Sequence, residues 1–389
     1  MEFSYFDNNA TTRIDEKVLE AMLPYLQDSY GNASSVQHKL GRQANHAVEK
    51  ARLQVAELLN ANPKEIIFTS GATESINTVI KGISKNYKTK GKHIITCKTE
   101  HKAVLNSCEV LEKNGLLVSY LDVDEFGQMD LDKLKQTIRE DTILVSLMAA
   151  NNETGILHPI VEIAKICQEK DVLFFCDATQ WIGKIPLDLQ KIPIDILCMS
   201  GHKIHGPKGV GALYIRRKSK PIQIPPLIVG GKQESGLRGG TYAVHQIVGL
   251  GEAAAQVNFS EPHENIRDYF EKKLIESIED ISIKTQRVKR LPNTSNVQFK
   301  HVKGSELMTK LSNIAISSGS ACVSGDRDPS HVLKAMGMTD EEAYCSLRFS
   351  FSKYNSKEEI DTAVLQIKSA VEQIRAHSPI WEMYKEGLI

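Results

Sequence analysis

Short runs of β-branched and other apolar residues alternate with helical patterns through the middle of the chain. Residues 66–69 form one such run, and Ile76, Val79, Ile80 and Ile83 follow it at the spacing of one helix face. This alternation predicts βαβ units and a mostly parallel sheet covered on both faces, with ligands at the carboxyl ends of its strands. Strands are expected at 66–69, 93–97, 116–122, 142–149, 172–177, 194–199 and 210–215, with helices that include 102–113, 130–139 and 160–170.

The pattern changes after about residue 258. The charged helical segment 261–280 is interpreted as a connector between domains, and a strand around 296–299 and a helix from Ser305 follow it. A final helix carries a long apolar stripe, which should pack on a sheet. The stripe consists of Ile360, Ala363, Val364, Ile367, Ala370, Val371 and Ile374.

The length of 389 residues suits about two domains. We expect a large α/β domain over 16–258 and a smaller α+β domain made of 1–15 and 259–389. The 48 basic and 48 acidic side chains cancel, which argues against stable binding of nucleic acid or an anionic membrane. No apolar stretch approaches the roughly 18 residues of a membrane span, and the first residues lack the features of a secretory signal. A cytoplasmic protein is therefore expected.

One of the seven cysteines differs from the others. An odd number without a Cys-x-x-Cys pair makes a poor disulfide framework and a poor zinc site. Cys322 lies among small and polar residues between 317 and 325, which predicts a loop that displays its thiol for chemistry. The remaining cysteines have apolar, helical or strand-like surroundings and are expected to be buried: Cys97, Cys108, Cys167, Cys176, Cys198 and Cys345.

Two segments at strand ends carry candidate binding groups. Residues 70–75, Ser-Gly-Ala-Thr-Glu-Ser, lie between a strand and a helix, where exposed amides and a hydroxyl suit a phosphate. A simple N-cap turn would explain the same residues. Asp177 ends an apolar strand, where a carboxylate needs a cationic or hydrogen-bonding partner. A turn-capping aspartate is the alternative.

The segment 200–209 offers an amine in a glycine-rich loop after another apolar strand. A lysine with a lowered pKa is the usual Schiff-base nucleophile, and both Lys203 and Lys208 qualify by spacing. A solvated basic loop is the alternative, and His202 and His205 lack a nearby third ligand for a metal. A phosphate loop, an aspartate and a lysine in this order predict a site for pyridoxal 5'-phosphate, in which the aspartate keeps the pyridine nitrogen protonated.

Motifs along nearly the whole chain resemble the cysteine desulfurases of the class V aminotransferase superfamily, in particular those that serve iron–sulfur cluster assembly (NifS/IscS type). The resemblance implies a pyridoxal phosphate-dependent transferase of fold type I and a homodimer. The motifs are YFDNNATT at 5–12, SGATES at 70–75, TEHKAV at 99–104, NNETG at 151–155, CDATQ at 176–180, SGHK at 200–203, SSGSAC at 317–322, LRFSFSKY at 347–354 and WEMY at 381–384.

The resemblance assigns cofactor-binding roles residue by residue. It implies that Lys203, rather than Lys208, carries the Schiff base, and that Asp177 pairs with the pyridine nitrogen. Gln180 corresponds to the residue near the phenolic oxygen of the ring, and His101 to a histidine that stacks on the ring and moves protons. Phosphate ligands correspond to Ala72, Thr73, Ser200 and His202, with Thr241 supplied by the neighbouring subunit.

The resemblance also implies the substrate contacts and the reaction. Arg348 corresponds to the residue that grips the substrate carboxylate, a bidentate task suited to guanidinium. Asn151 and Asn152 should point to opposite sides of an extended chain, and the resemblance favours Asn152 at the site. Cys322 corresponds to the nucleophile, so the implied products are L-alanine and a persulfide on Cys322. The chain departs from many relatives at Ser235 and Gly239, near Thr241, and in the stretch after Cys322.

Several alternatives share these motifs. Selenocysteine lyase, cysteine sulfinate desulfinase and aminotransferase reactions occur on the same fold, although the cysteine-bearing loop argues against an aminotransferase. An inactive sulfur-trafficking scaffold would have no need of Asp177, Lys203, Cys322 and Arg348 together. The expected sulfur acceptor is a protein, either an iron–sulfur scaffold or a relay for transfer-RNA thiolation.

Overall fold

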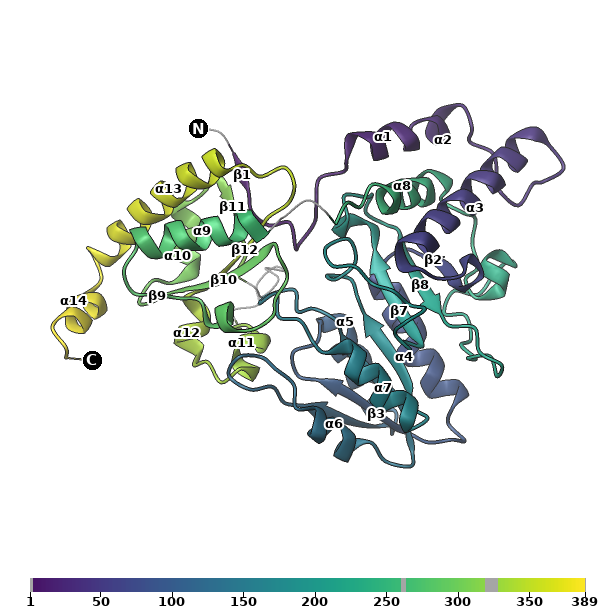
Figure 1. The fold of residues 1–389 in the computed structure, drawn as a ribbon, viewed down its shortest axis with the longest axis horizontal. Coiled ribbons are helices and arrows are strands. Elements are labelled where there is room, and N and C mark those ends of the chain that lie inside the picture. Colours follow the sequence, from purple (N-terminus) through teal and green to yellow (C-terminus); the bar gives the residue numbers. More distant parts are fainter. Residues whose placement is uncertain (1–2, 260–263, 319–327, 389) are drawn as a thin grey trace.

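The computed structural model describes residues 3–259, 264–318 and 328–388, and its larger lobe is built on a seven-stranded sheet (Figure 1). The strand order is β2-β8-β7-β6-β5-β3-β4, and only β8 runs antiparallel to its neighbours. Each strand overlaps its predicted range, so the mostly parallel sheet is confirmed. The strands are β2 (Ile66–Thr69), β3 (His93–Cys97), β4 (Leu117–Leu121), β5 (Thr142–Met148), β6 (Leu173–Asp177), β7 (Ile196–Ser200) and β8 (Gly211–Ile215).

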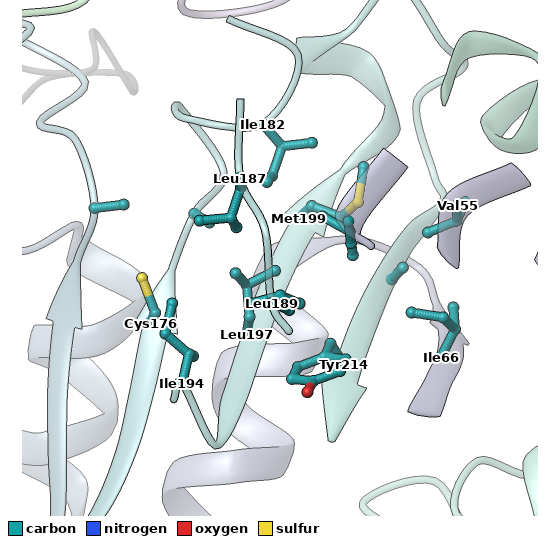
Figure 2. Close-up of a cluster of buried hydrophobic side chains, with 14 of the residues drawn as sticks. Val55, Ile66, Cys176, Ile182, Leu187, Leu189, Ile194, Leu197, Met199 and Tyr214 are labelled. Atoms are coloured by element: carbon teal, nitrogen blue, oxygen red, sulfur yellow. The ribbon is translucent and has the colours of Figure 1, made fainter. Parts of the chain in front are cut away.

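Helices cover both faces of this sheet, as the alternating pattern predicts. One face packs against α4 (Ala72–Asn86) and α5 (Lys102–Lys113), with Ile76, Ile80 and Val104 fully enclosed. The other core is shown in part in Figure 2, where the labelled side chains include those of Leu197, Met199 and Tyr214. Its helices are α1 (Glu16–Met22), α3 (Lys39–Leu59), α6 (Leu131–Thr137), α7 (Ile160–Glu169) and α8 (Val244–Ala255), while α2 (Pro24–Gln27) contacts α1 and α8.

The smaller lobe is an α+β unit on a three-stranded antiparallel sheet of order β12-β10-β9. The predicted apolar stripe of the last long helix is buried against this sheet, from Ile360 to Ile374. The elements of this lobe are β9 (Ile281–Ser282), β10 (Thr294–Phe299), β12 (Ser346–Ser350), α9 (Glu264–Ser277), α10 (Gly304–Lys310), α11 (His331–Ala335), α12 (Asp340–Tyr344), α13 (Lys357–Arg375) and α14 (Pro379–Lys385), with a short 3-10 turn at Lys284–Arg287. The larger lobe has 3-10 turns at Pro63–Glu65, Gly201–Lys203 and Gln233–Gly236.

The interpretation of 261–280 as a connector is wrong. Helix α9 packs along α13 and belongs to the smaller lobe. Phe270 and Leu274, four residues apart on one helix face, are fully enclosed in its core. Charged residues dominate the composition of α9, and two of them, Arg267 and Glu271, are themselves buried, so a composition-based reading misses the buried face.

The N-terminal segment joins the two lobes. Ser4–Tyr5 (β1) pairs with Ile314–Ala315 (β11), and Phe6 is enclosed in the core of the smaller lobe. Farther along, Thr12 and Asp15 donate backbone hydrogen bonds to carbonyls near the end of β7 in the larger lobe. We retain the division of the chain at residues 15 and 258 as a proposal that these contacts support. Within the described ranges, no helix has the length and apolar character needed to cross a bilayer.

Candidate active site

A cavity of about 750 Å³ lies at the carboxyl ends of the parallel strands. Met148, Asp177 and Ser200, the last residues of β5, β6 and β7, all line it. The smaller lobe closes part of the rim through Ser317 and through Arg348 on β12. The sequence-predicted residues that meet around this cavity are Ala72, Thr73, His101, Asn152, Asp177, Gln180, Ser200, His202, Lys203 and Arg348.

Lys203 occupies the 3-10 turn that directly follows β7. Its Nζ donates hydrogen bonds to the carbonyl oxygens of Asn9 (2.6 Å) and Ala10 (2.7 Å). Burial, assisted by the positive charge of Arg348, lowers the pKa of Lys203 to about 8. Lys208 also lines the cavity, but its side chain lies on the exposed turn that follows. The geometry thus gives Lys203 the environment of a nucleophilic amine.

Asp177 is buried at the end of β6, and a backbone amide holds one oxygen of its carboxylate. Its Oδ1 accepts a hydrogen bond from the backbone N–H of Thr179 at 3.0 Å. Glu100 is buried nearby, and burial together with the negative charge of Asp177 raises the pKa of Glu100 well above its usual range. This shift favours the protonated form of Glu100, and of the two acidic side chains only Asp177 lines the cavity.

The first turn of α4 presents backbone N–H groups suited to an anion. No side chain caps this helix, so the amides that follow Gly71 face the cavity without a local acceptor. Gly71 has a φ of 149°, and a Cβ built there would come within 3.4 Å of Ser200 Oγ. The hydroxyl of Ser200 thus lies against the start of the helix. Glu74 in the same turn is paired with Arg238, which offsets its negative charge.

His101 is the N-cap of α5, and its side chain faces the cavity. Its Nδ1 accepts a hydrogen bond from the backbone N–H of Ala103 at 3.1 Å, so the proton of the neutral ring lies on Nε2. Burial lowers the pKa of His101 below its ordinary value. The neutral form of the ring is therefore favoured at physiological pH, and it can donate a hydrogen bond only from Nε2.

Arg348 is buried on β12 and reaches into the cavity from the smaller lobe. Its Nη1 donates to the carbonyl of Asn152 at 2.9 Å, and its Nη2 pairs with Asp7 Oδ1 at 2.7 Å. Its buried Nε has no hydrogen-bond partner among the residues described. A buried guanidinium nitrogen without an acceptor indicates a site for an oxygen ligand.

The two adjacent asparagines do point to different sides. Asn152 lines the cavity. Asn151 points away, where its Nδ2 donates to the carbonyl of Thr99 and its Oδ1 accepts from the amides of Glu153 and Thr154. Asn151 therefore shapes the turn that presents Asn152.

One predicted site residue lies apart from the cavity walls, and another falls outside the described residues. Thr241 is exposed and does not line this cavity. The loop before it is anchored by Glu234, whose carboxylate makes two hydrogen bonds to Arg52, at 2.8 and 2.9 Å, and accepts a third from the amide of Phe68. Cys322 lies outside the described residues, while Ser330, closely after it in sequence, donates a hydrogen bond to Glu153.

The other six thiols are buried, as predicted. Burial raises the pKa of Cys97 to about 11 and that of both Cys108 and Cys167 to about 12. It also raises the pKa of Cys176, Cys198 and Cys345. Each of these groups is a protonated thiol at neutral pH and is therefore a poor nucleophile.

Sequence reasoning assigned no role to Asp7, Asn9 or Lys184. Asp7 and Asn9 belong to a motif that was recognised, but their parts in the site are a contact with Arg348 and a backbone carbonyl that holds Lys203. Because every residue has a backbone carbonyl, the residue type cannot indicate that this oxygen takes part in the site. Lys184 lies between turns without a periodic pattern and contacts Gln180 only in the folded chain.

The amino-acid sequence of this chain is similar to one protein family and to several named proteins. The model of the family described as Aminotransferase class-V matches residues 4–363. A protein named cysteine desulfurase IscS from Neisseria meningitidis serogroup A is 48% identical over 389 residues, covering 99% of this chain and 96% of the relative. The protein of that name from Colwellia psychrerythraea is 47% identical over 390 residues, covering 99% and 96%.

Solved structures of similar fold also cover most of this chain. A structure described as a NifS-like protein superimposes with a TM-score of 0.89 at 41% identity, covering 95% of this chain and 99% of its own. A structure described as SspA in complex with cysteine gives a TM-score of 0.82 at 39% identity, covering 91% and 100%.

Proposed function

This chain belongs to the class V aminotransferase family, and from that premise we propose that it is a cysteine desulfurase that uses pyridoxal 5'-phosphate. The reaction converts L-cysteine and the thiol of Cys322 into L-alanine and a persulfide on Cys322, so every atom of the substrate is accounted for. The observation that carries the proposal is that the Lys203 amine, the Asp177 carboxylate and an uncapped helix N-terminus open on one cavity.

The residues of the cavity fit pyridoxal phosphate. The amides after Gly71 and the hydroxyl of Ser200 would hold the phosphate, with Thr73 and His202 beside them. Asp177 would pair with the ring nitrogen, and Lys203 would carry the aldehyde carbon. When bound, the cofactor supplies an electron sink that stabilises negative charge at the substrate α-carbon.

Arg348 and Asn152 are proposed to bind the substrate carboxylate. Arg348 is already fixed by Asp7 and by the Asn152 carbonyl, so it loses little side-chain freedom when it binds. Its free Nε gives the carboxylate a donor that no described residue uses. This arrangement holds the amino acid by its carboxylate and leaves its thiol unrestrained by Arg348.

Lys203 and His101 are proposed to move protons. The free amine of Lys203 would remove the proton from the α-carbon, a task that suits a lysine with a pKa of about 8. His101 would serve as the general acid in its imidazolium form, with Nε2–H as the donor; because burial lowers its pKa, this form is the minor one at neutral pH and gives up its proton readily. Cys322 would attack the substrate sulfur as a thiolate, the form in which a cysteine is a strong nucleophile.

The depressed pKa of Lys203 predicts the pH dependence of cofactor uptake by the cofactor-free protein. The ammonium form cannot react with an aldehyde, and at pH 7 roughly one amine in ten is neutral if the pKa is about 8. The uptake rate should therefore rise about tenfold between pH 6 and 7 and level off above pH 8 to 9. Stopped-flow absorbance would measure it. A midpoint near the ordinary lysine value, about 10.4, would contradict the proposed environment.

The nearest alternatives are selenocysteine lyase and cysteine sulfinate desulfinase reactions. We expect alanine to form from L-cysteine in amounts equal to the sulfur released, with a kcat that depends on Cys322. Parallel assays with selenocysteine and cysteine sulfinate would test this choice. Higher kcat/KM for either of them, with no dependence on Cys322, would overturn the assignment to cysteine.

Partners and location are part of the proposal. A homodimer is supported by the exposed position of Thr241 on a loop anchored by the buried Arg52–Glu234 pair, because such a residue can reach a site in a second copy. The proposed sulfur acceptor is a protein, an iron–sulfur scaffold or a thiolation relay, as the sulfur must leave Cys322 for each new turnover. A cytoplasmic location is also proposed, and the six unpaired cysteines among the described residues support a reducing compartment.

A further inference from the structure

Behind the active-site cavity lies a second cavity of about 310 Å³. Lys203 lines both cavities, so its side chain stands in the wall between them. Lys184 also lines the second cavity. The function described above gives this second lysine no role.

Lys184 is tied to the active site through Gln180. Its Nζ donates a hydrogen bond of 2.6 Å to Gln180 Oε1 and lies 3.4 Å from Asn9 Oδ1. Gln180 Nε2 in turn donates to the Asn9 carbonyl at 3.0 Å, the same oxygen that accepts from Lys203. A continuous set of hydrogen bonds therefore joins Lys184, Gln180, Asn9 and Lys203.

The Asn9 carbonyl and Lys184 together set which way the Gln180 amide faces. The carbonyl can only accept, so Nε2 must point to it, and Oε1 is then placed to accept from the Lys184 amine. The second hydrogen of Nε2 remains for a group in the cavity that Gln180 lines. Without Lys184, Oε1 would lose its only described donor, and the Asn9 carbonyl alone would hold the amide in this orientation.

The surroundings of Lys184 favour a neutral amine. Burial, followed by the charges of Lys203 and Arg348, lowers the pKa of Lys184 well below its usual range. A neutral amine still donates to Gln180 without adding a second positive charge beside Lys203. The titratable and charged groups that face this region are Lys203 and Arg348, together with Asp15, Lys17, His205 and Lys353 on the walls of the second cavity.

We propose that Lys184 is a positioning residue that fixes the Gln180 amide with its nitrogen toward the cofactor. The inference rests on the proposed function, because it takes pyridoxal phosphate as the group that receives the hydrogen bond. It adds to that function a residue that acts from outside the active-site cavity, through one side chain.

Lys184→Met tests the role with readouts that do not depend on turnover. The dissociation constant of pyridoxal phosphate for the cofactor-free protein should rise roughly five- to tenfold, the effect of losing one hydrogen bond. The pH midpoint of the visible absorbance of the loaded protein should also shift, because the ring oxygen loses a fixed donor. Lys184→Gln, whose amide can still donate to Gln180, should recover most of both effects. Lys191→Met, at an exposed lysine nearby, should change neither.

A double-mutant cycle with Gln180→Ala shows whether Lys184 acts through Gln180. If it does, Lys184→Met should add nothing to the loss in affinity or to the shift caused by Gln180→Ala. Independent, multiplying effects would overturn the inference, and so would an unchanged absorbance midpoint in Lys184→Met. If the unaltered protein takes up no pyridoxal phosphate, the proposed function itself fails, and the two failures are thereby distinguished.

Discussion

Lys203→Ala should form alanine from L-cysteine roughly 10⁴-fold more slowly than the unaltered protein, or not measurably. Two tasks are lost together, namely the attachment of the cofactor and the removal of the α-carbon proton. The neighbouring groups cannot replace it, because the Nδ1 of His101 already accepts a hydrogen bond and Lys184 points to Gln180. Alanine measured by chromatography, together with the visible spectrum, would check the result.

Lys208→Ala is the matched control for this variant. Lys208 lies on the same glycine-rich segment and lines the same cavity, but its side chain is on an exposed turn. It should retain most of the turnover and the full cofactor spectrum. If Lys203→Ala still bound pyridoxal phosphate in a form that borohydride fixes to the protein, Lys203 would not be the attachment site.

Cys322→Ser should reduce alanine formation by about 10³-fold or more while leaving cofactor binding intact. A serine hydroxyl is almost entirely un-ionised at neutral pH, so no nucleophile remains to take the sulfur. The six buried cysteines cannot substitute, since burial keeps each of them protonated.

Cys345→Ala provides the control for Cys322→Ser, because it removes a buried thiol of the smaller lobe. It should lower the stability of that lobe modestly and leave turnover per folded molecule unchanged. Equal losses in both variants would indicate a structural effect rather than the loss of a nucleophile.

The large lobe was predictable because its signals are local. Each strand is a short apolar run, so all seven strands could be placed from the sequence, whereas α1, α3 and α8 were not among the predicted helices. The α9 segment was misinterpreted because its charged residues outnumber Phe270 and Leu274, its fully enclosed apolar side chains. Buried Glu271, which pairs with Arg290, also holds the helix in the smaller lobe, and a count of charges cannot reveal that contact.

Some residues of the candidate site could likewise be predicted from the sequence, and others could not. Asp177 and Ser200 end neighbouring strands and Lys203 lies in the turn after the second of them, so their convergence was implied by the parallel sheet. The hydrogen bonds that hold Lys203 and Gln180 were not predictable. Asn9 accepts from Lys203 through its backbone carbonyl, and Lys184 contacts Gln180 only in the folded chain. Such contacts depend on tertiary geometry and leave no trace in spacing.

The transfer of sulfur to Cys322 is the central claim, and mass spectrometry after a single turnover tests it most directly. The loaded protein would be mixed with less than one equivalent of isotopically labelled L-cysteine, alkylated and digested. The account predicts that the peptide containing Cys322 gains one labelled sulfur atom, in an amount equal to the alanine formed. Alanine formed in full with the label on another cysteine, or on none, would contradict it.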